Sequence, residues 1–150
     1  MAGKHLHVSI HFIWSTVDRL PLINTSWEPR LYSYMGGILA NMNARLIAAG
    51  GLADHSHLLV SMPSTESIAE IVGTVKANST SWVKSEIRPA TSFGWQKGYA
   101  AFSVSKSNEA EVIAYVNNQR EKHKSLTFKS ELVTLLDKHE ITYDEKYLWD

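Results

Sequence analysis

An alternation of apolar and polar side chains over residues 4–14 constrains the fold more than any other feature of this sequence. Because the side chains of a strand point to opposite faces in turn, every second residue shares a face. One face would carry Leu6, Val8, Ile10, Phe12 and Trp14, and the other His5, His7, Ser9, His11 and Ile13. The pattern predicts a strand with one face on the core. We interpret its three histidines as the polar face of the sheet, possible lining for a ligand surface, rather than as a second metal site.

The order of the remaining predicted elements indicates the fold class. Turn and capping residues separate a helix over 27–43, strands over 45–49 and 57–62, a long helix from about 65 to 87, a strand over 95–105, a helix from 107 or 108, and a short helix over 127–139. Residues 50–51 form a hairpin turn or bulge, or the strand continues through 51–53. The order βαββαβ predicts an α+β, ferredoxin-like (RRM-like) fold, an antiparallel sheet with helices on one face plus C-terminal helices. We expect a single domain over 1–150.

Composition excludes several classes of protein. The chain has no cysteine, so a thiol nucleophile, a disulfide and a cysteine-bound zinc ion are excluded. No apolar run approaches the roughly 18 residues that span a bilayer, and we expect no membrane partner and a cytoplasmic location. Net charge is zero, but acidic residues concentrate after residue 125. The remainder is mildly basic, which permits a phosphate-binding face.

His55 and His57 stand one residue apart before a short branched apolar run that we interpret as a buried strand. Side chains at positions i and i+2 of a strand share a face, so both imidazoles can reach one metal ion. Two histidines on a solvated sheet face are the alternative.

A second polar pattern follows the last predicted strand. Tyr115, Gln119 and His123 are spaced at i, i+4 and i+8 and would form one stripe on a helix. Tyr115 alone could be a packing residue. Together with the two imidazoles, an amide oxygen could hold a divalent cation with positions open to a phosphate oxygen, and a tyrosine one turn away could attack that phosphate.

Residues 53–60, 95–105 and 115–119 resemble the single-tyrosine HUH transposases of small bacterial insertion sequences and the related transposases associated with repetitive extragenic palindromes (REP). The resemblance runs nearly end to end, through residues 147–150. It implies a ferredoxin-like fold and a homodimer that cleaves and rejoins single-stranded DNA next to subterminal hairpins. The reaction would pass through a 5′-phosphotyrosine link and a free 3′-OH. It also implies a bacterial, nucleoid-associated protein.

By position, the resemblance makes Tyr115 the nucleophile and assigns His55, His57 and Gln119 to a Mg²⁺ or Mn²⁺ ion. The tyrosine helix would serve the histidine pair of the other subunit, so that each site is composed in trans. Asp54 and His123 are possible accessory residues. Ser56 departs from the usual hydrophobic residue between the histidines, which puts the packing beneath the site in doubt.

Candidate DNA contacts are basic residues on or near the predicted helices, although a plain solvated face explains them as well: Lys76, Lys84, Arg88 and Arg120.

The alternative function is non-catalytic binding of single-stranded nucleic acid, because residues 97–104 also resemble the aromatic strand motif of RNA-recognition modules. That motif would fall on the fourth strand instead of the third. A transposase descendant that binds hairpin DNA without cleaving it is a third interpretation.

Overall fold

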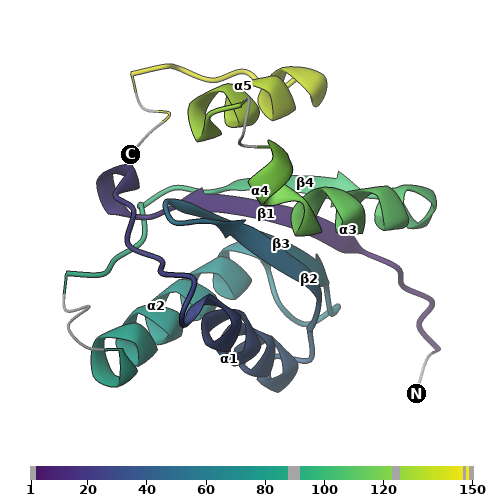
Figure 1. The fold of residues 1–150 in the computed structure, drawn as a ribbon. Coiled ribbons are helices and arrows are strands. Elements are labelled where there is room, and N and C mark those ends of the chain that lie inside the picture. The colour runs from purple at the N-terminus through teal and green to yellow at the C-terminus, as the bar shows by residue number, and fades with distance from the viewer. Residues whose placement is uncertain (1–2, 88–91, 123–125, 147, 149–150) are drawn as a thin grey trace.

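The computed structural model describes residues 3–87, 92–122, 126–146 and 148, and is built on one antiparallel sheet (Figure 1). The strand order is β2-β3-β1-β4. Their bounds are β1 Ser9–Ser15, β2 Arg45–Leu52, β3 His55–Ser61 and β4 Ala100–Val104. Two short 3-10 helices, Val17–Arg19 and Lys106–Asn108, lie in the connections. The α+β class and the βαββαβ order predicted from the sequence are confirmed.

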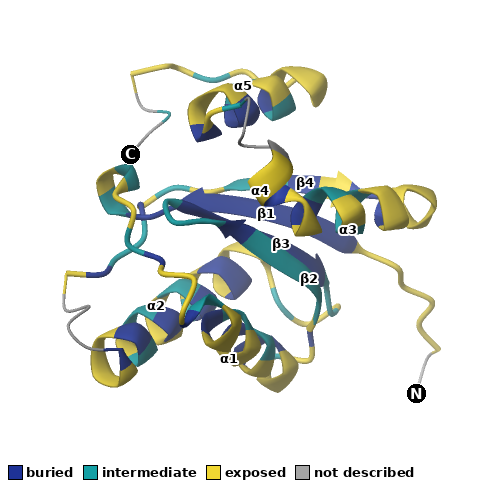
Figure 2. Ribbon diagram, viewed as in Figure 1, coloured by how far each residue is buried: buried dark blue, intermediate teal, exposed yellow. Residues whose placement is uncertain are grey.

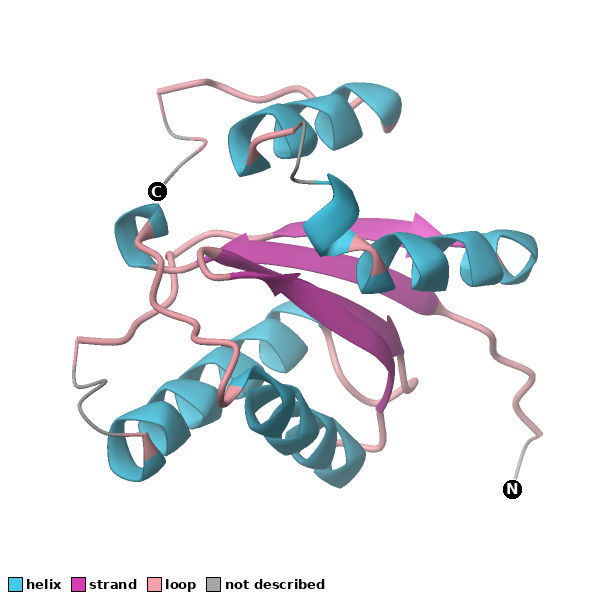
Figure 3. Cartoon of the chain, viewed as in Figure 1, coloured by secondary structure: helices cyan, strands magenta, loops and turns pink. Residues whose placement is uncertain are grey.

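One face of the sheet is covered by α1 (Glu28–Asn41) and α2 (Ile68–Glu86), as Figure 3 shows. The main core lies between these helices and the sheet. Most strand residues that point to this face are apolar: Ile10, Phe12, Trp14, Leu58 and Val60. The buried stripes of the helices meet them, with Leu31, Met35 and Leu39 from α1 and Ile71, Val72, Val75 and Val83 from α2. This matches the face that the alternation of β1 assigns to the core.

The opposite face is covered by α3 (Glu109–Asn117), α4 (Gln119–Lys122) and α5 (Phe128–Lys138). A smaller apolar cluster docks α5 on the sheet through Ile13, Phe102, Phe128, Leu132 and Leu136. Tyr143 and Leu148 of the tail pack against this cluster. Figure 2 shows that the central strands β1 and β3 are buried between the two layers. The prediction of a single core face for β1 is therefore wrong, since all seven of its residues are buried.

Several boundaries differ from those expected. β1 starts at Ser9 because the registered pairs with both β3 and β4 end there, so residues 4–8 lie beyond its ladders. β4 is shorter than residues 95–105, because Lys76 donates hydrogen bonds to the carbonyls of Gln96 and Gly98. The side chain of Ser67, rather than Ser64 or Thr65, caps α2 by accepting from the Glu70 amide. The helix expected to run through Gln119 breaks at Asn118.

Gly50 explains how the tyrosine-bearing helix reaches the sheet. It lies within β2, and a Cβ atom built on it would collide with the carbonyl oxygen of Val116 in α3. Only glycine allows so close an approach of two backbones. A Cβ atom built on Gly51 would likewise collide with the carbonyl oxygen of His55. The two residues therefore belong to the strand, with α3 packed over them, and the turn falls at Ala53 and Asp54.

Candidate active site

His55 and His57 lie side by side on the face of β3 that is turned toward α3–α5. Their shared direction follows from the two-residue period of a strand. Both residues have no exposed surface, because Phe128 of α5 stacks on His55 with ring centroids 4.4 Å apart and Tyr115 of α3 meets His57 edge-on. The pair is thus a buried polar centre and not part of a solvated sheet face.

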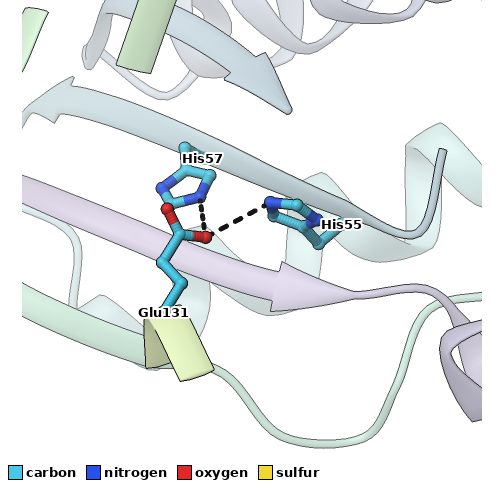
Figure 4. Close-up of side chains that lie close together, drawn as sticks. All are labelled: His55, His57 and Glu131. Carbon is cyan, nitrogen blue, oxygen red and sulfur yellow. Dashed lines mark hydrogen bonds and ion pairs between the residues drawn. The ribbon is translucent and has the colours of Figure 1, made fainter. Parts of the chain in front are cut away.

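Glu131 of α5 completes a group of three possible metal ligands (Figure 4). Its Oε1 lies 3.2 Å from Nε2 of His57 and 3.4 Å from Nε2 of His55, and the residue is 1% exposed. One ligand atom from each of the three lies within 4.8 Å of the others, so the group could hold a metal ion. Glu131 was not among the site residues predicted from the sequence. Its signal was an acidic residue on the apolar stripe of the helix, level with Phe128, Leu132 and Leu135.

The far nitrogens of both imidazoles are held by a second layer of side chains. Nδ1 of His55 lies 2.7 Å from Oδ1 of Asp54, and Nδ1 of His57 lies 2.8 Å from Nε2 of His11. Burial, and then the neighbouring His57, lower the pKa of His11 to about 3, so His11 is neutral and can accept this hydrogen bond. The Nε2 atoms of both imidazoles then face Glu131 and donate hydrogen bonds to it, and loss of these protons would leave each Nε2 lone pair free for a metal ion. Metal-binding histidines are commonly oriented in this way.

Gln119, at the start of α4, brings an amide oxygen to the same place. Its Oε1 lies 3.0 Å from Nε2 of His55. Its Nε2 donates to Oε2 of Glu131 over 3.1 Å and to the carbonyl of Tyr115 over 3.4 Å, which fixes the amide orientation. The helix break at Asn118 does not separate Gln119 from the histidines.

Tyr115 projects from α3 into the group, and its hydroxyl donates a hydrogen bond to Oε2 of Glu131. Burial, followed by the hydrogen bond and the charge of Glu131, raises the pKa of the Tyr115 hydroxyl above its usual range. The tyrosine is therefore protonated at neutral pH. Tyr115, Gln119 and both histidines meet within one chain.

The electrostatics favour positive charge between the imidazoles. Burial lowers the pKa of His55, but hydrogen bonds to Asp54, Glu131 and Gln119 outweigh it and raise the value to about 9. Burial would raise the pKa of Glu131, yet hydrogen bonds from His55 and His57 hold it well below the usual range. The donor set of two imidazoles, a carboxylate and an amide oxygen suits a divalent cation.

Ser56 points to the opposite face of β3, where its hydroxyl lies 3.0 Å from the hydroxyl of Tyr32 in α1. A buried polar side chain is tolerated when it is hydrogen-bonded. Tyr32 therefore satisfies the hydroxyl of Ser56, and the serine can be buried beneath the site where the family usually has a hydrophobic residue.

The candidate DNA contacts lie in different surroundings. Lys76 is half-buried, donates hydrogen bonds to three backbone carbonyls and lies 5.4 Å from the ring centre of Trp14, and burial lowers its pKa to about 8. These contacts give Lys76 a structural role, and its contact with a DNA phosphate stays a prediction. Lys84 is exposed on α2, away from the site, and Arg120 forms an ion pair with Glu28 over 3.4 Å. Arg88 and His123 lie outside the described residues.

A cavity of about 430 Å³ borders Tyr115 between β4, α3 and α5. Its walls include aromatic and amide side chains, among them His11, Phe102, Asn118 and His139. Ligand pockets in proteins commonly have volumes of roughly 300–1,000 Å³. The cavity is therefore large enough for a small organic group beside Tyr115.

The fold and the buried donor group define an α+β domain with a candidate metal-dependent active site. The sequence model of the family described as "Transposase IS200 like" matches residues 4–119, and the chain belongs to this family of IS200-like transposases. The resemblance inferred from the sequence is thereby confirmed, and family membership supports a role in DNA recombination. No curated protein sequence matches the chain.

Among the solved structures that share the fold are two transposases. A putative transposase from Deinococcus radiodurans R1 is 22% identical with a TM-score of 0.63, over 79% of this chain and 95% of that one. A REP-associated tyrosine transposase bound to a REP hairpin is 12% identical with a TM-score of 0.60, over 82% of this chain and 74% of that one. Among the described residues, we find no helix with the length and apolar character needed to cross a bilayer.

Proposed function

We propose that this protein is a transposase that cleaves and rejoins single-stranded DNA next to subterminal hairpins, with Tyr115 as the nucleophile. The observation that carries the proposal is the meeting of the Tyr115 hydroxyl with the paired histidines in one buried polar centre. The REP hairpin in a structural neighbour supports a hairpin DNA partner for this chain. Non-catalytic binding of nucleic acid gives no reason for this combination of side chains.

His55, His57 and Gln119 would hold a Mg²⁺ or Mn²⁺ ion in this proposal. Their donor atoms suit a shared ion, because both Nε2 atoms and the amide oxygen point to the same part of the site. Asp54 and His11 hold the imidazoles in this orientation through hydrogen bonds to their Nδ1 atoms. When bound, the ion would withdraw electron density from the scissile phosphate and make it more open to attack.

Tyr115 would perform the covalent step. As its oxygen bonds to phosphorus, the hydroxyl proton passes to an acceptor, the bond from phosphorus to the 3′-oxygen breaks, and that oxygen takes up a proton. The products are a 5′-phosphotyrosine and a free 3′-OH. Attack by another 3′-OH reverses the step, rejoins the strand and restores Tyr115. The cavity beside Tyr115 offers room for the nucleotide next to the scissile phosphate.

A homodimer remains part of the proposal, as the resemblance implies. The contacts of Tyr115 with histidines of its own chain support a site assembled in cis, in contrast to the trans composition expected from the resemblance. Subunit exchange distinguishes the two. A mixture of Tyr115→Phe with the His55→Ala, His57→Ala variant has one complete site per mixed dimer only if sites are composed in trans. We expect no DNA adduct from this mixture, and recovery of adduct would establish the trans arrangement.

Metal-dependent nicking tests the proposal as a whole. Wild-type protein with Mg²⁺ or Mn²⁺ and a single strand carrying a hairpin should give a nicked strand and an adduct that survives a denaturing gel. Tyr115→Phe keeps the ring and should give neither, while binding the hairpin as tightly as wild type. Hairpin binding by wild type without nicking under any of these conditions would favour the non-catalytic alternative.

A further inference from the structure

α5 lies beyond the residues that the family model matches, and yet it delivers a carboxylate to the centre of the site. The helix is firmly docked. Thr127 caps its first turn by accepting from the Ser130 amide, and Phe128, Leu132 and Leu136 pack into the apolar cluster. Glu131 lies on the same packed face of the helix and is 1% exposed. This placement is therefore set by the packing of the helix.

The two oxygens of Glu131 face different partners. Oε1 lies 3.2 and 3.4 Å from the two histidine Nε2 atoms, and Oε1 of Gln119 lies 3.0 Å from Nε2 of His55. Neighbouring ligands at the ~2.1 Å distances of Mg²⁺ are about 3.0 Å apart in an octahedral shell. The separations of these donor atoms are therefore close to those of ligands around one ion.

The second oxygen, Oε2, accepts hydrogen bonds from the Tyr115 hydroxyl and from the Gln119 amide. The Tyr115 hydroxyl is thus tied to the same carboxylate that faces the histidines. Burying a carboxylate is costly unless positive charge accompanies it. A divalent ion between two neutral imidazoles would supply that charge without disturbing the contact with Tyr115.

We propose that Glu131 is a bridging carboxylate, with Oε1 as a metal ligand and Oε2 as the group that positions the Tyr115 hydroxyl. This inference rests on the proposed function for the identity of the metal and of the nucleophile. Its consequence is that α5 belongs to the catalytic machinery: binding of the ion and placement of the tyrosine are coupled through one side chain.

The test measures Mn²⁺ affinity of the DNA-free protein by calorimetric titration, and DNA nicking separately. Glu131→Gln keeps the shape of the side chain but loses its charge, and we expect Mn²⁺ affinity to fall at least about tenfold and nicking to fall with it. Asp137→Asn is the matched control, since it removes the same charge from an exposed position of the same helix. It should change neither quantity.

Glu131→Asp keeps the charge on a shorter side chain and guards against a folding defect. We expect it to bind Mn²⁺ more tightly than Glu131→Gln and less tightly than wild type. Unchanged Mn²⁺ affinity in Glu131→Gln would overturn the inference. So would faster nicking, because that result would mean that the carboxylate occupies the place of the scissile phosphate and that α5 inhibits the enzyme.

The inference and the proposed function can fail separately. If wild type binds Mn²⁺ and Glu131→Gln weakens that binding, the ligand role of Glu131 stands even when no hairpin strand is nicked. If wild type nicks DNA and Glu131→Gln retains both its Mn²⁺ affinity and its nicking rate, the proposed function stands and the bridging role is rejected.

Discussion

The two faces of the sheet are equally buried but built from opposite chemistry. Toward α1 and α2, β1 and β3 present a mostly apolar surface that includes Phe12 and Leu58, with the hydrogen-bonded Ser56 as its polar residue. Toward α3–α5, the alternate residues of the same strands include His11, His55 and His57. Burial of apolar surface is the main source of folding stability, whereas buried polar groups mostly offset their own desolvation cost. We infer that the first face maintains the fold and the second performs the chemistry.

Removing both histidines should have the largest effect on function. His55→Ala, His57→Ala should abolish metal-dependent nicking, because both imidazole ligands are lost. It should also lower the free energy of unfolding by about 3–5 kcal/mol, since Glu131 is left as a buried charge with neither imidazole beside it. Urea unfolding followed by circular dichroism measures this loss.

A third substitution sharpens the first prediction. Adding Glu131→Gln to the histidine double variant removes the stranded charge, so part of the lost stability should return while nicking stays absent. If the triple variant is no more stable than the double, the cost lies in the cavity that the histidines leave, and the electrostatic account of this face is wrong.

Leu39→Ala makes the matched change on the apolar side. Leu39 is fully buried in α1, remote from the site, and the substitution should cost about 2–5 kcal/mol of unfolding free energy. The nicking rate per folded molecule should remain within about twofold of wild type at a temperature where the variant is folded. A larger loss of rate would show that the two faces are not independent.

Much of this division could be predicted from the sequence. The period of two places His55 and His57 on one face, and the alternation of β1 assigns Phe12 to the core. Glu131 was missed because its burial depends on the docking of α5, a tertiary event that local pattern does not encode. Strand pairing is also a tertiary event that local pattern does not encode. The alternation therefore continues through residues 4–8, although the registered strand pairs end at Ser9.

Gly50→Ala tests the close backbone contact that sets the distance between α3 and the sheet. A methyl group there would push against the Val116 carbonyl and move Tyr115, and displacements of about 1 Å at an active site can cost roughly 100-fold in rate. We expect nicking to fall at least about tenfold with Mn²⁺ affinity retained. Gly37→Ala is the control, since nothing lies within 4 Å of its added methyl group in α1.

Ser56→Ala should have the smallest effect. It leaves the Tyr32 hydroxyl without this partner and should lower the unfolding free energy by about 1 kcal/mol, with no change in nicking. Tyr32→Phe in the same chain should restore part of the loss, as measured by a double-mutant cycle. Strictly additive effects of the two substitutions would argue against a stabilising hydrogen bond.

The identity of the DNA-linked residue tests the central claim most directly. Wild-type protein is incubated with Mn²⁺ and a hairpin-bearing single strand, the adduct is digested with protease and nuclease, and the modified peptide is sequenced by mass spectrometry. Our account predicts a nucleotide joined through its 5′-phosphate to Tyr115. A nucleotide joined to any other residue would contradict it.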